Sequence, residues 1–194
     1  MSNEILNTDE AYYYALRALA RKDAMMRLNA RILRDGGAQE WDGTSLASIN
    51  DEAIFYAETE WPKWYGEKTH YGFVKPWEKI WNHTQRQPAN FNVAVWQSVE
   101  NQNVLQGMAT GTASSGREHL TLNWVERSFA PTYLRFGALI PVLLCFEGYG
   151  RLLGVRRLLI KNPVDEAKYK RYGYVDVEIH KSTTRYLGKE ISYD

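Results

Sequence analysis

The stretch from Gly154 to Asn162, GVRRLLIKN, decides the fold of this chain. Its apolar run from Val155 to Lys161 is short and is led by a glycine, which is typical of a buried strand. The residues after it predict a short helix over Val164 to Tyr172 and a strand over Tyr174 to His180. A further edge strand is expected within Ser182 to Asp194. The end of the chain is therefore predicted to alternate strands with one short helix.

Three consecutive strands are predicted before this stretch, over Phe91 to Gln97, Val104 to Thr112 and Leu120 to Glu126. The first alternates apolar and polar residues, and polar turns separate the three, so they are expected to pair antiparallel. A helix within Pro131 to Leu153 then permits a parallel crossover. The predicted sheet is mixed: mostly antiparallel, with one parallel pair in the middle.

Helical composition dominates the start of the chain. Asn7 is expected to cap a helix that runs to Asp35, where Gly36 and Gly37 stop it. The apolar stripe of this segment is interrupted at Arg21 to Asp23. The segment therefore forms either two short helices or one long helix that touches two different partners.

The rest of the N-terminal region is predicted to hold a loop and two shorter helices. Residues 37–50 are predicted as loop, and Asn50 is expected to cap a helix from Asp51 to about Glu60. A third helix is predicted from about Pro76 to Arg86. Because no convincing strand is found in this part, we divide the chain into a helical N-terminal region, residues 1–88, and a core, residues 89–194.

The composition is that of an ordinary soluble globular protein. Of 194 residues, 44% are hydrophobic and 24% are charged, and the formal net charge is +1. No global field therefore favours nucleic acid or a membrane as partner. The most apolar segment, Phe136 to Phe146, is too short to span a bilayer, and the start of the chain lacks the features of a signal peptide. We expect a cytoplasmic protein.

Sites that depend on sulfur or on a metal are not indicated. Cys145, the single cysteine, lies in an apolar run and is expected to be a small buried hydrophobe rather than a nucleophile. The four histidines are scattered without the spacing of metal ligands. We therefore predict no metal site.

Charged and aromatic residues are unevenly distributed. Residues 35–70 carry eight acidic residues against two lysines, which either attract a cationic substrate or form a solvated face. The stretch from Trp61 to Trp81 holds four of the seven tryptophans. It is neither basic nor repeated, so aromatic packing is favoured over stacking on nucleic acid bases. The same stretch is a candidate interface for a protein partner or a second copy.

The residues from Gly154 onward resemble the closing segment of the GNAT superfamily of N-acyltransferases. That family commonly enters this strand with a Gly-Val-Arg-Arg-Leu-like sequence. It often places an Asn after the strand, a Tyr seven residues later, a Gly four beyond that, and then an aromatic residue. The matching residues here are Asn162, Tyr169, Gly173 and Tyr174.

This resemblance covers about residues 90–180 and agrees with the predicted order of elements. It implies an α/β (α+β) fold with a GNAT-like mixed, mostly antiparallel sheet flanked by helices, here with a helical N-terminal extension. It also implies an activity, in which acetyl-CoA or another acyl-CoA gives its acyl group to an amine by direct attack. In the family the part before the core shapes the acceptor pocket, so residues 1–88 would serve the acceptor side or bind a partner.

The resemblance assigns roles to two residues near the end of the chain. The CoA thiolate that leaves takes a proton from a tyrosine hydroxyl, and Tyr169 would be that acid. Alternatively, Tyr169 only packs the short helix against the sheet. Asn162 would contact the pantetheine arm or position the donor helix. It could also cap the helix that begins at Pro163.

The family binds the CoA pyrophosphate at the turn before its long helix. Backbone N–H groups of small residues wrap the phosphates there, and the helix N-terminus adds positive potential. The corresponding turn runs from Tyr133 to Ala138, and Arg135, Gly137 and Ala138 fit the pattern. Phe136 stands where a Gly is expected, and Pro141 would disturb the helix unless the helix begins just before it.

A base is also required, because the amine must lose a proton to attack. Leu120, Leu122, Trp124 and Glu126 are expected to share one face of their strand. Glu126 is the candidate base, since it ends that strand near the point where the sheet of the family splays; otherwise it is a solvated strand end. Glu147 is another carboxylate, but it lies at the far end of the helix.

Two other interpretations remain open at the level of sequence. A GNAT-like scaffold without catalysis, acting as a binding or assembly protein, is favoured by Phe136, Pro141 and the missing first strand. An unrelated mixed α/β binding module would make the match near the end of the chain coincidental. The intervals between Asn162, Tyr169 and Gly173 favour the enzyme.

Overall fold

The computed structural model describes residues 2–35, 41–66, 75–132, 134 and 137–193. Its centre is a seven-stranded sheet with the strand order β1-β2-β3-β4-β5-β7-β6. The strands β4 and β5 pair in parallel, and every other neighbouring pair is antiparallel. The predicted mixed, mostly antiparallel sheet with one parallel pair in the middle is confirmed.

Most strands lie where the sequence predicts them. In chain order they are β1 (Thr44–Ala47), β2 (Phe91–Val99), β3 (Gln102–Ala113), β4 (His119–Arg127), β5 (Arg157–Lys161), β6 (Val175–Val177) and β7 (Tyr186–Glu190). The strand expected within Ser182 to Asp194 is present, but its expected place at the edge of the sheet is wrong. The last strand, β7, lies between β5 and β6, and β6 forms the edge.

The expectation that the N-terminal part holds no strand is also wrong. Thr44–Ala47 forms β1, an edge strand that pairs antiparallel with residues 94–97 of β2. Four residues give too short an alternation to be recognised in sequence. Pairing with β2 stabilises the strand in the fold.

The helices surround this sheet on both faces. They are α1 (Ser2–Asp35), α2 (Asp51–Thr59), the 3₁₀ helix η2 (Trp61–Trp64), α3 (Trp77–Thr84), α4 (Leu139–Leu153) and α5 (Glu166–Lys170). The first is a single long helix, which settles the choice between one helix and two, and Asn7 lies inside it rather than at its cap. Asn50 caps α2 as expected, because its side chain accepts a hydrogen bond from Ala53 N–H at 2.9 Å.

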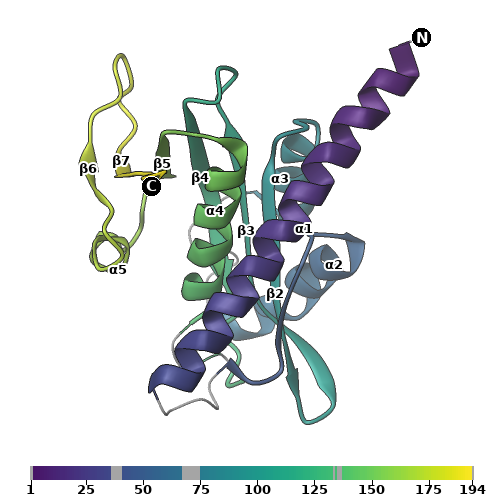
Figure 1. Ribbon diagram of the computed structural model, residues 1–194. Coiled ribbons are helices and arrows are strands. Elements are labelled where there is room, and N and C mark those ends of the chain that lie inside the picture. Colours follow the sequence, from purple (N-terminus) through teal and green to yellow (C-terminus); the bar gives the residue numbers. More distant parts are fainter. Residues whose placement is uncertain (1, 36–40, 67–74, 133, 135–136, 194) are drawn as a thin grey trace.

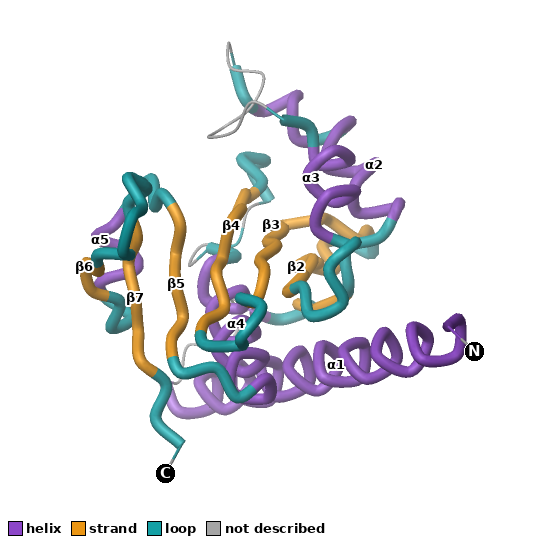
Figure 2. Tube along the Cα trace, turned by 90° about the horizontal axis from the view of Figure 1, so that it is seen from above, coloured by secondary structure: helices purple, strands orange, loops and turns teal. Residues whose placement is uncertain are grey.

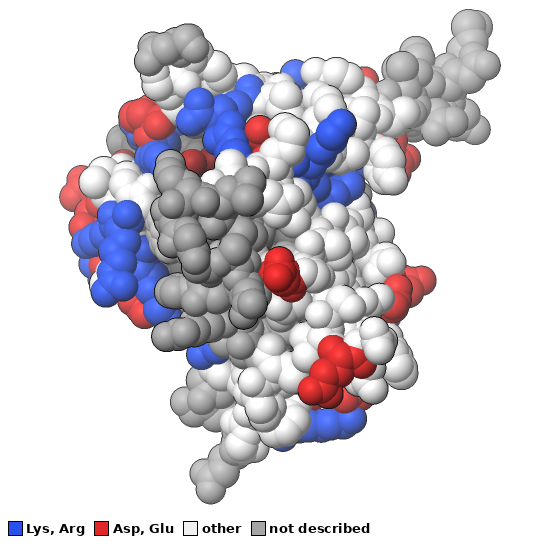
Figure 3. Space-filling model, turned by 60° about the horizontal axis from the view of Figure 1, so that its bottom comes forward, with Lys and Arg blue, Asp and Glu red and all other residues white. Residues whose placement is uncertain are grey.

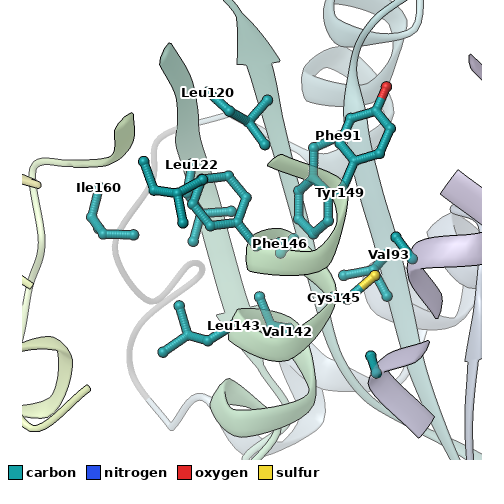
Figure 4. Packing of buried hydrophobic residues seen from close by; sticks show 14 of the residues in the cluster. Phe91, Val93, Leu120, Leu122, Val142, Leu143, Cys145, Phe146, Tyr149 and Ile160 are labelled. Atoms are coloured by element: carbon teal, nitrogen blue, oxygen red, sulfur yellow. The ribbon is translucent and has the colours of Figure 1, made fainter. Parts of the chain in front are cut away.

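The molecule has three layers, which Figure 2 shows in projection. Helices α1 and α4 lie on one face of the sheet, and α2 and α3 lie on the other. The larger core fills the α1–α4 side, where Phe146 and Tyr149 of α4 contact Phe91 of β2 (Figure 4). A smaller, aromatic-rich core lies beneath α2 and α3. No helix among the described residues is both long and apolar enough to cross a membrane.

Candidate active site

Strand β4 extends beyond its pairing with β5. The parallel pair covers only residues 119–122 of β4 and 157–160 of β5. The remaining residues of β4, from Asn123 to Arg127, have no strand partner on the β5 side among the described residues. Their backbone therefore borders a break in the sheet, and Glu126 lies in this portion of the strand.

A β-bulge determines the face to which Glu126 points. Thr110 of β3 pairs with Trp124, but its neighbour Gly111 pairs with Leu122, so Asn123 is an extra residue in β4. A bulge interrupts the alternation of side chains. Leu122 packs in the α1–α4 core, whereas Trp124 packs against the α2–α3 core. The prediction that Leu120, Leu122, Trp124 and Glu126 share one face is wrong for this reason.

Glu126 is buried and hydrogen-bonded on the α2–α3 side. Its residue is only 4% exposed. The hydroxyl of Tyr65 donates to Oε1 at 2.5 Å, and the indole Nε1–H of Trp77 donates to Oε2 at 2.6 Å. Burial of an ionised carboxylate is costly, and these donors offset part of that cost. Glu126 is therefore an enclosed carboxylate and not a solvated strand end.

The donors come from the segment that the sequence shows as aromatic-rich. Tyr65 follows η2, and Trp77 is the first residue of α3. Trp61 of η2 donates its indole N–H to the backbone oxygen of Leu105 at 3.0 Å. All three rings are buried, which confirms aromatic packing for them. Trp64 is about half exposed, so it is a ring of this stretch that a partner could reach.

Tyr65 keeps its proton in this arrangement. Burial raises the pKa of its hydroxyl above the ordinary value, and the hydrogen bond to Glu126 and the charge of that carboxylate raise it further. A neutral phenol bound to a buried carboxylate can pass a proton to that carboxylate when it receives another. The Tyr65–Glu126 pair therefore has the chemistry of a short proton relay.

The turn before α4 is fixed to the sheet by Gln106. This residue is the extra residue of a second bulge, between Leu105 and Gly107 of β3, and it is fully buried. Its amide N–H donates to the backbone oxygen of Thr132 at 2.9 Å, and its Oε1 accepts from the backbone N–H of Leu134 at 3.2 Å. Gln106 thus ties the start of the turn to β3, through the backbone of Thr132 and of Leu134.

Two of the residues predicted to bind pyrophosphate meet the steric demands of such a turn. Gly137 has a φ of +79°, which favours glycine. Ala138 packs closely on β3: a Cβ added at Gly107 would lie only 2.7 Å from the Cβ of Ala138. The turn therefore runs directly against the sheet. Arg135 and Phe136 lie outside the described residues.

Pro141 does not disturb α4, contrary to the concern raised by the sequence. The helix begins at Leu139, so Pro141 stands in its first turn, where an N–H group has no helical partner in any case. Pro141 does, however, leave the N-terminus of α4 with fewer backbone N–H donors. Proline removes one of the N–H groups that a helix N-terminus offers to an anion.

Tyr169 lies on the other side of the sheet from Glu126. It is on α5 and packs against the α1–α4 core, with its ring edge-on to Tyr174 at 6.4 Å between centroids. Burial, followed by the charge of Asp165, raises the pKa of its hydroxyl to about 12. This hydroxyl makes no hydrogen bond to a described residue.

Asn162 does not cap α5. The cap is Asp165, whose side chain accepts from the backbone N–H of Lys168. Asn162 is exposed, with a φ of +47°, and its backbone N–H donates to the backbone oxygen of Arg185 at 2.9 Å. The residue therefore forms the corner where β5 turns toward α5.

Solved structures share this architecture. The ribosomal-protein-S18-alanine N-acetyltransferase from Escherichia coli matches with a TM-score of 0.55 at 16% identity, over 78% of this chain and 96% of its own. An acetyltransferase from Thermus thermophilus gives 0.56 at 15%, over 76% and 97%, and Ard1 from Thermoplasma volcanium gives 0.50 at 12%, over 77% and 99%. This chain has the GNAT fold. No protein-family model matches the sequence, and no curated protein matches it.

The other candidate groups take structural positions within the GNAT fold. Glu147 forms an ion pair with Lys189 at 2.8 Å and accepts from the hydroxyl of Tyr174, so it is engaged away from Glu126. Cys145 is fully buried, and burial raises the pKa of its thiol to about 12. Among the residues that the structure describes, no cluster of three or more His, Cys, Asp or Glu could hold a metal ion.

Sequence reasoning missed the contacts of Tyr65, Trp77 and Gln106 in the candidate site. Each acts across a long separation: 61 residues from Tyr65 to Glu126, 49 from Trp77 to Glu126, and 28 from Gln106 to Leu134. No local pattern marks such contacts. The one signal in the sequence is the concentration of tryptophans between Trp61 and Trp81, which indicates a packed aromatic region without indicating its partner.

Proposed function

We propose that this protein is an N-acyltransferase that moves an acetyl or other acyl group from acyl-CoA to an amine by direct attack. The observation that carries the proposal is the buried carboxylate of Glu126 beside the break in the sheet near the end of β4, with Tyr169 on the other face of the sheet. A thioester at the break beside β4 would have a proton acceptor on one face and a hydrogen-bond donor on the other.

The cosubstrate would enter from the α4–α5 side. The small residues Gly137 and Ala138 permit close approach to the backbone, and the N-terminus of α4 favours a phosphate there. Figure 3 shows Lys and Arg side chains gathered on the α5–β7 side of the molecule, where exposed lysines and arginines stand among acidic partners. Asn162 and Arg135 would add contacts to the pantetheine arm and the phosphates.

The acceptor would approach from the α2–α3 side, so that the part of residues 1–88 that holds α2, η2 and α3 shapes its site. The neutral amine nitrogen attacks the thioester carbonyl carbon, and the carbon–sulfur bond breaks as the amide forms. Glu126 accepts the proton that the nitrogen loses, directly or through Tyr65. The departing thiolate accepts a hydrogen bond from Tyr169 and takes its proton from that hydroxyl or from solvent.

Tyr169 is better suited to stabilise the thiolate than to lose its proton outright. Its pKa is raised to about 12, whereas a free thiol has a pKa of about 8.5. Complete transfer from the phenol to the thiolate is therefore uphill by roughly 3 to 4 pKa units. A hydrogen bond to the developing negative charge requires no such transfer.

The proposal is tested by turnover of acetyl-CoA with a panel of amines, with release of free thiol as the readout. Turnover that falls by about 10²-fold or more in Glu126→Gln but persists in Glu118→Gln, an exposed carboxylate just before β4, would support it. CoA binding without turnover for any amine would favour the binding or assembly scaffold instead.

A further inference from the structure

A groove separates α1 from the edge strand β1, on the side of the sheet opposite Glu126. It is a cavity of about 340 Å³, which lies within the range of small-molecule sites, roughly 300–1,000 Å³. Four residues of one α1 face and three of β1 line it: Ala18, Arg21, Lys22, Met25, Thr44, Ser45 and Leu46. None of these residues belongs to the proposed acyl transfer site.

Arg21 is a buried cation that forms no ion pair with a described residue. Its residue is 9% exposed, and its Nη1 has no hydrogen-bond acceptor in the described part of the chain. The acidic neighbour on the same helix, Asp23, is engaged with Arg27 at 2.9 Å. Arg17, one turn earlier, is also buried and adds positive charge. An unpaired charge at such a position is costly unless something else neutralises it.

The other walls of the groove complement this charge. Thr44 is 9% exposed, and its hydroxyl Oγ1 also lacks a hydrogen-bond partner among the residues that the structure describes. Lys22 is exposed at the rim and contributes a second cation. Ala18, Met25 and Leu46 provide an apolar wall. Cationic and hydroxyl donors beside an apolar wall suit an oxyanion carried on a small organic molecule.

We propose that the α1–β1 groove binds the oxyanion, phosphoryl or carboxylate, of a small molecule, with Arg21 as its counter-charge. Lys22 closes the rim, and Thr44 donates its hydroxyl. The ligand is distinct from the acyl-CoA of the proposed reaction, because the groove is lined by α1 and β1 at one edge of the sheet and not by the turn before α4 or by α5. Binding would fix α1 to the edge of the sheet.

Thermal unfolding in matched ionic strength tests this site. The wild-type protein is measured in chloride, in inorganic phosphate and in citrate. We expect phosphate or citrate to raise Tm by about 3–6 °C over chloride at ten times the dissociation constant. The anion that gives the shift tells phosphoryl from carboxylate. Both arms are repeated with saturating CoA, so that occupancy of the acyl-CoA site cannot produce the shift.

The Arg21→Met variant tests whether the anion binds in the α1–β1 groove or elsewhere on the protein. We expect it to abolish the anion-dependent shift and, because it replaces an uncompensated buried cation with an apolar chain, to raise Tm in chloride. Arg27→Met, which removes an exposed cation on the same helix outside the groove, should keep the shift. A shift that survives in Arg21→Met, or the absence of any shift in the wild type, would overturn the proposal.

Discussion

Glu126 has a role in packing, and the proposed reaction gives it a second role as a base. Its two oxygens accept hydrogen bonds from the hydroxyl of Tyr65, which precedes α3, and from the indole of Trp77, the first residue of α3. These bonds hold both residues against β4. The same enclosure keeps the carboxylate out of bulk water. In the proposed reaction, this enclosed carboxylate would accept the proton of a bound amine. The two roles predict different consequences of substitution, and kinetics can separate them.

We expect Glu126→Gln to lower kcat by about 10²- to 10⁴-fold, the usual contribution of a positioned acid or base. The dissociation constant for CoA should change little, because Glu126 lies on the acceptor face. Stability should fall modestly, since the amide N–H₂ of glutamine faces one of the two donors. Steady-state kinetics, calorimetry and thermal unfolding of the same preparation give the three readouts. Unchanged kcat with reduced stability would assign Glu126 to packing alone.

Tyr169→Phe removes only the hydroxyl from a ring that packs against the α1–α4 core. We expect kcat to fall about 10- to 100-fold, equivalent to a hydrogen bond to a charged group of ~1.5–3 kcal/mol. Affinity for CoA and thermal stability should stay near the wild-type values, because the ring contacts with Tyr174 persist. Equal turnover in the variant and the wild type would remove Tyr169 from the mechanism.

At this scale the sequence predicted the identity of Glu126 and Tyr169 as candidates but not their surroundings. The strand parity used for Glu126 failed because the extra residue Asn123 cannot be seen without the partner strand. Tyr65 escaped notice because a phenol acquires its role only when the fold brings a carboxylate to it. Side-chain identity is local, whereas burial and partners are properties of the folded chain.

In the proposed reaction, cosubstrate binding depends on the turn before α4. Gln106 anchors this turn with bonds to the backbone of Thr132 and Leu134. We expect Gln106→Met, which keeps the length of the side chain, to weaken CoA binding about 5- to 50-fold, because the two hydrogen bonds that hold the turn, ~0.5–1.5 kcal/mol each, are lost. Calorimetric titration measures the change.

The matched control is Gln102→Met, an exposed glutamine on the same strand, which should bind CoA as the wild type does. If both variants bind CoA equally well, the position of the turn does not depend on Gln106, and the anchoring role assigned to it is wrong.

Elements with strong local patterns were predicted well, and short ones were not. The three strands from Phe91 onward, α2 and α3 all have alternation, caps or breakers that mark them. Strand β1 has four residues, and its pairing with β2 is what stabilises it. Strand β1 also fixes the order of the helices: α1 precedes the first strand, and α2 and α3 follow it.

The whole molecule buries several phenols, which gives its stability a dependence on alkaline pH. Burial raises the pKa of Tyr149 and of Tyr169 to about 12. In the unfolded chain both would lose their protons near pH ~10. The folded state therefore binds more protons between about pH 10 and 12, so the stability that these groups contribute is present below pH ~10 and is lost as pH rises toward 12.

We expect ultraviolet titration of phenolate absorbance to show a native fraction of the 13 tyrosines that ionises only near or above pH 12. In denaturant all of them should titrate near pH ~10. Tyr169→Phe should reduce the delayed fraction. Native titration of every tyrosine at the denatured midpoint would contradict the burial of these rings.

The long helix α1 lies across the α4 side of the sheet and extends past the body of the molecule at its start (Figure 1). It packs on α4 through Ala20, Ala24 and Leu28, which are small or apolar and fully buried. The candidate catalytic site and the groove beside β1 thus belong to one packed unit. Acyl transfer and the oxyanion site can be tested on the same intact chain.

The most direct test of the proposed acyltransferase is calorimetric titration of the intact protein with acetyl-CoA. The account predicts saturable one-to-one binding with a micromolar dissociation constant, at a site where Gln106→Met weakens it. An absence of binding at millimolar acetyl-CoA would contradict a cosubstrate site at the turn before α4, and with it the transfer reaction.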